Sequence, residues 1–301
     1  MKILNFGSLN IDNVYTVSHF VRPGETLATE QLDLFCGGKG LNQSIALSKA
    51  GATVYHAGKI GEDGKILLDI LQEHGVNTQW VEQAAGRSGH AVIQVDASGQ
   101  NCILLYGGTN QQITEEQIDR TLSDFGPGDL LLLQNEINGL DLLLIKAAQK
   151  EMQIALNPSP VSPKLLEMPL ENVTLFVFNE IEGEMLSGVL EPDQMLAAIR
   201  KKYPSAVLLL TLGKHGAVYD DGIRRLRHGI YDVPRVDTTG AGDTFTGYFL
   251  ARTAAGDSPE LALELASVAS SIAVSRSGAA ASIPKLDEVL RAREVLKPVI
   301  V

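Results

Sequence analysis

The sequence is poor in positive charge. Its 25 lysine and arginine residues stand against 36 aspartates and glutamates, which gives a formal net charge of -11 at pH 7. Proteins that bind nucleic acids or anionic membranes need an excess of positive charge to meet the phosphates of their partner. The composition therefore argues against both kinds of partner, but it leaves room for a phosphorylated ligand that is held at one local site.

Long apolar runs and clusters of metal-binding residues are also missing. Apolar runs such as Val207 to Leu210 fall far short of the roughly 20 residues that span a bilayer, and Met1 to Phe6 is too short for a signal sequence. The two cysteines, Cys36 and Cys102, and the six histidines show no metal-ligand spacing. We therefore expect a cytoplasmic protein with reduced thiols and without a catalytic zinc ion.

What the sequence does contain is an alternation of strand-like and helix-like segments. With 45% hydrophobic and 20% charged residues, the 301-residue chain has the composition of a globular protein. Short apolar runs bounded by Gly, Pro or Asn predict strands covered on both faces at residues 2–6, 53–60, 129–134, 153–157, 174–178 and 206–212. Helical patterns between them predict helices at residues 41–50, 65–74, 114–125, 140–151 and 192–203. This order predicts an α/β fold with a doubly wound, mainly parallel sheet.

Two stretches break this alternation. Residues 13–36 and 87–106 carry β-rich or alternating sequence, and Ser98-Gly99 has the form of a hairpin turn. Neither stretch fits a crossover helix. We expect them to form a small antiparallel β sheet that stands off the main sheet as a lid over a site.

The rest of the chain continues the main pattern without a break. A second hairpin is expected with its turn at Asp221-Gly222, followed by helices from residue 241 to about residue 296. No linker or low-complexity tract separates these parts. We therefore expect residues 1–301 to form one α/β domain with the lid inserted into it.

The segment from Asp237 to Gly247, DTTGAGDTFTG, is the strongest candidate for chemistry. Gly240 and Gly242 remove side chains just before a helix, so free backbone N–H groups point outward at its positive end, which suits a transferring phosphoryl group. Asp243 on the first turn can accept a proton from a substrate hydroxyl. Alone, this carboxylate could merely stabilise the helix start. Two glycines, two threonines and a second aspartate within seven residues are more than capping requires.

A second glycine cluster, from Phe35 to Gln43 (FCGGKGLNQ), opens another predicted helix. The glycines would let a ligand approach the backbone closely, while Lys39 and Asn42 could hydrogen-bond its hydroxyls. The cluster is not a Walker loop, because no Gly-Lys pair in the chain is followed by Ser or Thr. The turn after the first strand has only Gly7, so an NAD-dependent dehydrogenase is poorly supported.

Polar side chains follow several predicted strands. Asn10 and Asp12 come after the first strand, and Glu136 and Asn179 come after two later ones. Open α/β sheets bind ligands at this edge, although each such residue alone could be a helix cap. Asn179 and Glu182 lie three residues apart on one helix face and could hold the water shell of Mg²⁺.

Together these motifs resemble the ribokinase (PfkB-type) family of carbohydrate kinases. The resemblance covers nearly the whole chain and is carried by Gly7–Asp12 (GSLNID), Gly37–Asn42 (GGKGLN), Asn157–Pro160 (NPSP), Asn179–Glu182 (NEIE), Thr211–Gly213 (TLG), Asp237–Asp243 (DTTGAGD), Arg276–Gly278 (RSG) and Ser282–Pro284 (SIP). It implies a ribokinase-like α/β fold and an ATP-dependent kinase that phosphorylates a neutral sugar, with D-ribose and ribose 5-phosphate as the first expectation. It also implies Mg²⁺ and an activating K⁺.

The resemblance implies roles for individual residues. Asp243 is expected to be the catalytic base, with Gly240, Ala241, Gly242 and Asp243 forming the anion hole. The expected sugar contacts are Asn10, Asp12, Gly38, Lys39, Asn42, Glu136 and Asp243. The expected nucleotide contacts are Asn179, Thr211 and Gly213, with Glu182 near the Mg²⁺ and phosphates. The expected K⁺ site comprises Asp237, Thr239, Ala273, Arg276, Gly278 and Ser282, several of them through backbone carbonyls.

The resemblance leaves the substrate of the kinase open. Gly240 fits the wider family better than ribokinases, so the segment does not single out ribose. A deoxy sugar or another pentose, a keto-deoxy acid, a nucleoside or a sugar phosphate could be the substrate. An anionic substrate would call for an arginine cluster, and the lid has only Arg22 and Arg87. His90 stands where a small apolar residue is expected, and it either faces solvent or the other lid strand, or reshapes the sugar pocket.

Two further expectations concern the chain as a whole. A sugar or nucleotide sensor without catalytic activity is the competing function, but such a protein should have lost Asp243 or its glycines. A detached sheet would expose an apolar face, which a second copy could cover. We therefore expect a homodimer formed through residues 13–36 and 87–106, as in related kinases.

Overall fold

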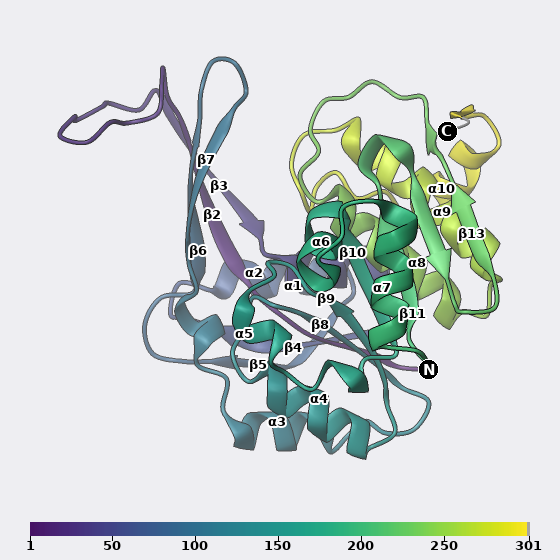
Figure 1. The fold of residues 1–301 in the computed structure, drawn as a ribbon. Coiled ribbons are helices and arrows are strands. Elements are labelled where there is room, and N and C mark those ends of the chain that lie inside the picture. Colours follow the sequence, from purple (N-terminus) through teal and green to yellow (C-terminus); the bar gives the residue numbers. More distant parts are fainter. Residues whose placement is uncertain (300–301) are drawn as a thin grey trace.

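A nine-stranded sheet forms the centre of the protein (Figure 1). The structure is a computed structural model that describes residues 1–299. The strand order is β13-β12-β11-β10-β9-β8-β1-β4-β5. In chain order the strands are β1 Ile3–Phe6, β4 Val54–Ile60, β5 Asn77–Gln83, β8 Leu130–Gln134, β9 Gln153–Asn157, β10 Leu175–Asn179, β11 Val207–Thr211, β12 Ala217–Asp220 and β13 Arg225–His228. Strands β11 to β5 run parallel, and β12 and β13 add an antiparallel edge. The predicted mainly parallel sheet is confirmed.

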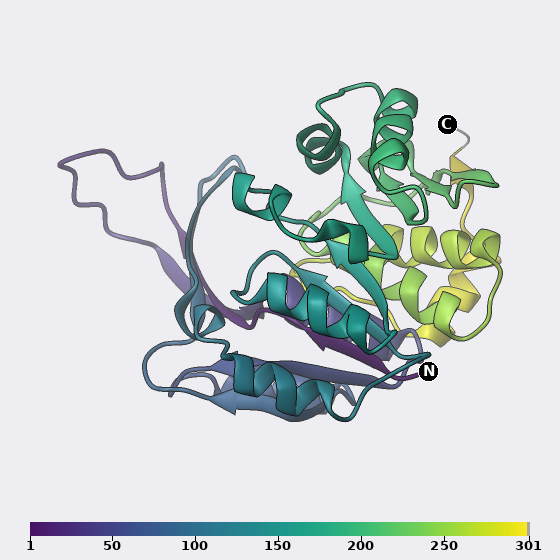
Figure 2. The ribbon, with the colours of Figure 1, turned by 60° about the horizontal axis from the view of Figure 1, so that its bottom comes forward.

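Helices cover both faces of this sheet (Figure 2). One apolar core lies under α1 Lys39–Lys49, α2 Lys65–Glu73, α8 Ala241–Ala254, α9 Pro259–Val274 and α10 Leu286–Arg293. The other lies under α3 Glu115–Leu122, α4 Leu140–Gln149, α5 Pro163–Leu166, α6 Glu180–Ser187 and α7 Pro192–Lys202. Consecutive strand residues alternate between the cores, as Leu131 and Leu132 do, which explains the unbroken apolar runs. Within residues 1–299, no helix is long and apolar enough to cross a membrane.

The predicted strands and helices all occur, with ends shifted by at most three residues. Gly51 and Gly75 end α1 and α2 with positive φ angles of 95° and 74°, as expected for glycines that close a helix. Strand β5 was not predicted. It lies at the edge of the sheet, where its sequence NTQWVEQ is mostly polar and only half buried, so it lacks the apolar run that marked the other strands.

A separate four-stranded sheet projects from this body (Figures 1 and 2). Its order is β3-β2-β6-β7, with β2 Asn10–Thr16, β3 Gln31–Gly37, β6 Gly89–Val95 and β7 Asn101–Tyr106. The pairs β2–β3 and β6–β7 are antiparallel as predicted, and β2 joins β6 in parallel. Gly99 turns the β6–β7 hairpin with a φ angle of 78°. The small sheet starts earlier than predicted, because β2 follows β1 after only three residues.

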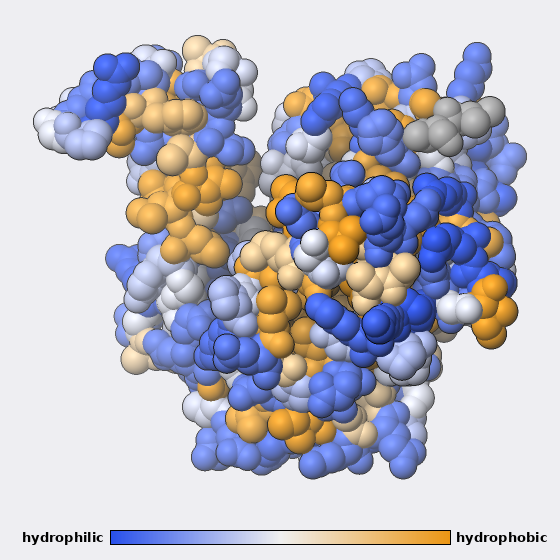
Figure 3. All heavy atoms as spheres, viewed as in Figure 1, coloured by the Kyte–Doolittle hydropathy of each residue, from blue (hydrophilic) through white to orange (hydrophobic). Residues whose placement is uncertain are grey.

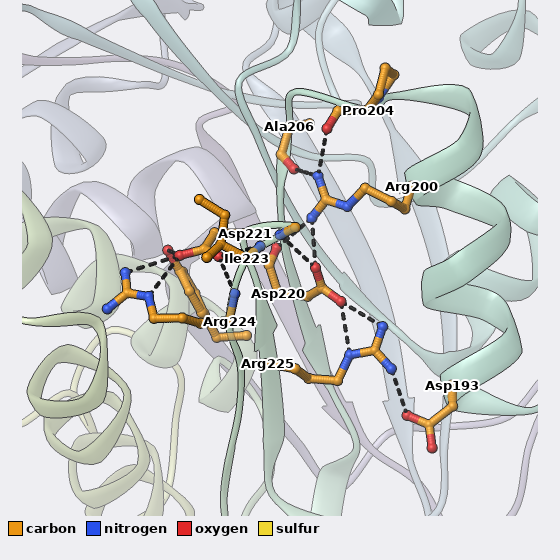
Figure 4. Close-up of polar contacts among 11 residues, drawn as sticks. Asp193, Arg200, Pro204, Ala206, Asp220, Asp221, Ile223, Arg224 and Arg225 are labelled. Carbon is orange, nitrogen blue, oxygen red and sulfur yellow. Dashed lines mark hydrogen bonds and ion pairs between the residues drawn. The ribbon is translucent and has the colours of Figure 1, made fainter.

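An ion-pair network fastens the antiparallel edge to α7 (Figure 4). Asp220 at the end of β12 is 5% exposed and accepts hydrogen bonds from Arg200 of α7 at 2.8 Å and from Arg225 of β13 at 2.6 Å. The Gly222 N–H donates to the same carboxylate at 2.9 Å. Asp193 extends the network by accepting from Arg225 at 3.3 Å. Strand β13 pairs with β12 but has little apolar sequence, so these charged contacts add to its attachment.

Short auxiliary elements complete the chain. They are the 3₁₀ helices Gly108–Gln111, Leu170–Asn172 and Gly213–His215, and the short strands β14 Ile230–Tyr231 and β15 Pro298–Val299, which pair with each other.

Candidate active site

Helices α1 and α8 begin at one cavity of about 260 Å³. Gly38 precedes α1 with φ 93°, and Gly240 precedes α8 in the left-handed conformation with φ 73°. A side chain at either position would be strained, so the backbone turns into both helices at glycine. The cavity is lined by Lys39, Asn157, Val177, Phe178, Asn179, Glu182, Thr211, Thr238, Gly240, Gly242, Asp243 and Thr246. The two glycine segments singled out in the sequence thus meet at one site.

Asp243 is buried beside α1, with 8% of its surface exposed. The Asn42 Nδ2 donates a hydrogen bond to Oδ2 at 3.0 Å, and the Gln43 Nε2 donates to Oδ1 at 2.9 Å. Both donors are neutral amides, so they orient the carboxylate without neutralising its charge. Among residues 1–299, the buried Asn42 Oδ1 has no donor of its own. A hydroxyl group bound next to Asp243 could supply one.

The N-terminus of α8 offers free backbone donors. The Ala241 N–H already donates to the Thr238 carbonyl at 3.3 Å. The N–H groups of Gly242 and Asp243 find no acceptor among residues 1–299. Together with the positive end of the helix dipole, these two amides make an anion site at the cavity.

Lys39 lies among three carboxylates. Burial by itself would lower the pKa of its ammonium group, but the charges of Asp243, Glu136 and Glu182 outweigh burial and raise that pKa above the ordinary value. Lys39 therefore stays charged at neutral pH. It is placed to neutralise an anionic group that enters between these acids.

Glu136 also lies close to a second carboxylate, that of Asp12. The Ser8 hydroxyl and the Lys39 N–H both donate to Glu136 Oε2, the latter at 3.0 Å, yet burial still raises the pKa of this carboxyl. Burial, and then the charge of Glu136, raise the pKa of Asp12 to about 6. A Cβ at Gly37 would overlap the Asp12 carboxylate, so a larger residue there would displace Asp12 from its present position.

Asn10 is held by a residue that the sequence analysis missed. The Asn110 Nδ2 donates to Asn10 Oδ1 at 2.7 Å and also to the Leu9 carbonyl, while Asn110 Oδ1 accepts from the Leu9 N–H at 3.0 Å. Asn110 is 1% exposed and lies in a short 3₁₀ helix. Its sequence context, GGTNQQ, carries no strand or helix signal that could have indicated this contact.

Asn179 and Glu182 cap α6 as well as lining the cavity. Asn179 Oδ1 accepts from the Glu182 N–H at 2.9 Å, and Glu182 Oε2 accepts from the Asn179 N–H at 3.0 Å. This is a capping box, which the Asn-x-x-Glu spacing could have indicated. The second carboxylate oxygen of Glu182 remains for a ligand in the cavity, so this pair fits the outer shell of a hydrated Mg²⁺.

Asp237 ties together the two loops predicted to bind K⁺. Its Oδ1 accepts from the Thr239 N–H at 2.9 Å and hydroxyl at 2.7 Å, and its Oδ2 accepts from the Gly278 N–H at 3.0 Å. Burial would raise the pKa of Asp237, but these hydrogen bonds outweigh it and hold the pKa below the usual value. An ionised carboxylate between two loops rich in backbone carbonyls fits a monovalent cation.

The remaining residues predicted for K⁺ have other side-chain contacts. The Arg276 guanidinium pairs with Glu288 of α10, and the Ser282 hydroxyl donates to the Ala279 carbonyl at 2.8 Å. The Ala273 carbonyl accepts from the Arg276 N–H at 3.1 Å. Only the backbone carbonyls of Arg276 and Ala273 could therefore bind K⁺. The carbonyl of Ala273 already accepts one hydrogen bond.

The cavity brings together seven of the predicted site residues. They are Lys39 of the predicted sugar contacts, Asn179, Glu182 and Thr211 of the predicted nucleotide and Mg²⁺ residues, and Gly240, Gly242 and Asp243 of the predicted anion hole. Ala241, the other predicted sugar contacts (Asn10, Asp12, Gly38, Asn42 and Glu136) and the predicted K⁺ residues are not among its lining residues. Gly213 is not among its lining residues and begins a 3₁₀ helix after β11. Thr238, Thr246 and Asn157 line the cavity without having been assigned a role in the sequence.

His90 and Asp12 lie on opposite faces of the small sheet. It pairs with Tyr106 in register, and their rings lie 5.0 Å apart. Asp12 pairs with Ala91, the next residue of β6. Because neighbouring strand residues point to opposite faces, His90 faces away from Asp12 and packs on the other strand. It does not reshape the pocket around Asp12.

Known proteins resemble this chain in both sequence and fold. The model of the pfkB family carbohydrate kinases matches residues 1–286. Ribokinase from Staphylococcus aureus (strain COL) is 34% identical over 299 residues, covering 96% of this chain and 98% of that protein. Ribokinase from Cryptococcus neoformans in complex with ADP has a TM-score of 0.84 at 32% identity, covering 96% of this chain and 99% of that one. Arabidopsis thaliana ribokinase complexed with ribose and ATP has a TM-score of 0.84 at 28% identity, covering 97% and 98%. This chain belongs to the pfkB family of carbohydrate kinases.

Proposed function

We propose that this chain transfers the γ-phosphate of ATP to D-ribose and forms ribose 5-phosphate. The observation that carries the proposal is the placement of the Asp243 carboxylate on the first turn of α8, beside free backbone N–H groups and Lys39. The relatives support the choice of sugar, because one solved ribokinase structure is described with ribose and ATP together.

Asp243 serves as the base in this reaction. Its carboxylate takes the proton of the attacking hydroxyl, the hydroxyl oxygen forms a bond to the γ-phosphorus, and the bond to the β-phosphate oxygen breaks to release ADP. The N–H groups of Gly242 and Asp243 and the Lys39 ammonium meet the negative charge of the γ-phosphoryl group. The protein works mainly by aligning these groups.

The sugar lies between the small sheet and α1. Asn10, Asp12, Lys39, Asn42 and Glu136 contribute its contacts, and Gly38 leaves room for it. The Asn42 Oδ1 accepts a hydrogen bond from a sugar hydroxyl, which satisfies an otherwise unpaired buried atom. Carboxylates outnumber the one lysine around this position, so a neutral sugar fits better than a keto-deoxy acid or a sugar phosphate.

ATP extends from α8 toward β10 and β11. Asn179, Thr211 and the loop at Gly213 contact the nucleotide, and Glu182 holds the water shell of Mg²⁺. The Asp237 and Gly278 loops would hold K⁺ through the Asp237 carboxylate and backbone carbonyls, including those predicted in the sequence. When bound, Mg²⁺ would neutralise phosphate charge next to Glu182, and K⁺ would sit beside the loop that leads into α8.

The chain works as one α/β domain whose small sheet acts as a lid and as a dimer interface. The space-filling view shows apolar surface over the small sheet (Figure 3). Leu34, Leu104 and Tyr106 are 59%, 71% and 57% exposed, which is unusual for a folded sheet. A second copy would cover this surface. The reaction takes place in the cytoplasm, which keeps Cys36 and Cys102 as thiols.

Sedimentation tests the dimer. Leu104→Glu should convert a dimer at micromolar concentration into a monomer, because it buries a charge in an apolar interface. Ile223→Glu is the control, because Ile223 is 94% exposed and lies outside the small sheet. A wild-type protein that sediments as a monomer contradicts this part of the proposal.

The activity is tested by measuring ADP release with ribose, 2-deoxyribose, a nucleoside and a keto-deoxy acid, each with and without K⁺. We expect the highest kcat/KM with ribose, and a product identified as ribose 5-phosphate by NMR. Faster turnover with 2-deoxyribose would move the assignment to a deoxy sugar kinase. Binding of ribose and ATP without any ADP release would instead identify a sensor.

A further inference from the structure

Three fully buried side-chain amides form a chain beneath Asp243. They are Gln43 of α1, Gln134 at the end of β8 and Asn5 of β1, all with 0% exposure. The Gln134 Nε2 donates to Gln43 Oε1 at 2.7 Å and to Asn5 Oδ1 at 2.9 Å. The Gln43 Nε2 donates to Asp243 Oδ1 at 2.9 Å and to Asn157 Oδ1 at 3.2 Å. The chain thus ends on the carboxylate assigned as the base.

Two backbone carbonyls fix the direction of every hydrogen bond in this chain. The Asn5 Nδ2 donates to the Gly40 carbonyl at 2.8 Å, so Asn5 Oδ1 must be an acceptor and Gln134 must donate to it. The Asn157 Nδ2 donates to the Val177 carbonyl at 2.8 Å, so Asn157 Oδ1 also accepts. Both anchors require Gln43 to present its NH₂ group, and not its oxygen, to Asp243.

A reversed Gln43 amide would fail at each of its contacts. Its oxygen would face the Asp243 carboxylate and Asn157 Oδ1, and its nitrogen would face the Gln134 nitrogen. Buried unpaired or repelling polar groups are costly, so one orientation is strongly selected. The packing between sheet and α1 therefore dictates the orientation of the Asp243 carboxylate.

We propose that Gln43 is a positioning residue for phosphoryl transfer, which holds Asp243 Oδ1 so that the carboxylate faces the substrate hydroxyl in one orientation. The proposal rests on the assignment of Asp243 as the base. Asn42 holds the other carboxylate oxygen, and the two amides together fix the plane of the group. Gln43 contacts neither substrate, since it is fully buried behind Asp243 and absent from the cavity lining.

The test compares Gln43→Met with a matched control. Methionine keeps the size of the side chain but donates no hydrogen bond. Gln117→Met is the control, because Gln117 is also 0% exposed and its Nε2 donates to the Gly58 carbonyl at 2.9 Å, away from Asp243. We expect Gln43→Met to lower kcat by about 10- to 100-fold, the value of one charge-assisted hydrogen bond. The KM values for ribose and ATP should change less than about threefold, because ground-state binding is retained.

The control and Asp243→Asn separate the possible outcomes. Gln117→Met should lower the melting temperature to a similar extent as Gln43→Met while leaving kcat unchanged. Wild-type kcat in Gln43→Met, together with an inactive Asp243→Asn, overturns the role of Gln43 alone. Near-normal turnover in Asp243→Asn overturns the assignment of the base instead.

A second variant keeps the proposal testable if Gln43→Met does not fold. Gln134→Met leaves Gln43 in place but removes the donor that fixes its orientation. We expect a smaller loss in kcat, about three- to tenfold, again with little change in KM. A folded Gln134→Met variant with wild-type kcat would count against the chain as a positioning device.

Discussion

Two aspartates are almost equally buried in this protein, but their partners differ in charge. Asp220 and Asp243 are 5% and 8% exposed. Asp220 accepts hydrogen bonds from two guanidinium groups, those of Arg200 and Arg225, and from the Gly222 N–H (Figure 4). Asp243 accepts from the neutral amides of Asn42 and Gln43.

The difference agrees with a structural role for Asp220 and with the role of base proposed for Asp243. Burial would raise the pKa of Asp220, but its hydrogen bonds to Arg225, Gly222 and Arg200 outweigh burial and hold the pKa below its usual value. Such a group has little tendency to take up a proton. Asp243 is oriented by two neutral amides, an arrangement that suits a proton acceptor held in one position. The charge of the partners therefore indicates function better than burial does.

Asp243→Asn should have the largest effect. It keeps the shape of the side chain but removes the base, so kcat should fall at least 100-fold, the lower end of what general-base catalysis supplies. The affinity for ATP, measured by calorimetry, should stay close to that of the wild type. Near-normal turnover would mean that the contrast with Asp220 carries no information about chemistry.

Asp220→Asn should give the opposite pattern. Removing the charge leaves two arginines without their partner, and the free energy of unfolding should fall by roughly 1–3 kcal/mol. Because the two sites are independent, kcat should stay within about twofold of the wild type. The measurements are chemical denaturation and steady-state kinetics. A large loss of kcat at full stability would contradict the structural role.

The stability that Asp220 contributes should depend on pH. Asp220 has a lowered pKa in the folded state, so its contribution to stability is fully present above the usual value of 3.8 and is lost as the pH falls through the lower folded-state pKa. The stability difference between wild type and Asp220→Asn should shrink accordingly in acid denaturation curves. A difference that persists at the lowest pH would show that packing, and not charge, is lost in the variant.

Asp12 differs from Asp220 because burial and the charge of its neighbour Glu136 raise its pKa. Its raised pKa of about 6 means that it becomes protonated as the pH falls through 6. If the ionised form binds sugar hydroxyls, the dissociation constant for ribose should rise by up to about tenfold for each pH unit below 6. Calorimetry without ATP measures this directly, and Asp12→Asn should bind ribose with little dependence on pH. A flat profile in the wild type would remove Asp12 from the sugar contacts.

Salt should produce the smallest effect. Arg225 is 39% exposed at its side chain, so 1 M NaCl, with a Debye length of about 3 Å, should screen part of its attraction to Asp220. The stability cost of Asp220→Asn should then fall by a few tenths of a kcal/mol. The stability cost of Gln43→Met should hardly change, because the contacts that it removes are buried and the Gln43 amide is uncharged. Equal salt responses would remove the distinction between the two networks.

The sequence alone predicted the parts of the fold that local patterns determine. The apolar runs and the glycines after α1 and α2 marked the strands and helix ends, and the resemblance indicated the family. Strand β5 was missed because an edge strand needs less apolar sequence. The parallel pairing of β2 with β6 could not be read from either stretch, because it depends on contacts between strands that are distant in sequence.

The site was predicted less completely than the fold, for a similar reason. The glycine segments and Asp243 have local signatures, and the structure brings them to one cavity. Gln43, Gln134 and Asn110 are ordinary polar residues in sequence, and only burial and mutual hydrogen bonding distinguish them. Asn179 and Glu182 have a second role, because they cap α6. Their Asn-x-x-Glu spacing could have predicted this capping box.

The hydrogen bond between Gln43 and Asp243 also bears on how the enzyme is made. It joins residues 200 positions apart, so it closes a very long loop that local contacts cannot stabilise early in folding. During synthesis, β1 to β13 and both strand pairs of the small sheet emerge before α8. A nascent chain that stops before Ala241 would carry the residues assigned to the sugar and lack the base. With Asp243 as the proposed base, catalysis has to wait until α8 has docked onto α1.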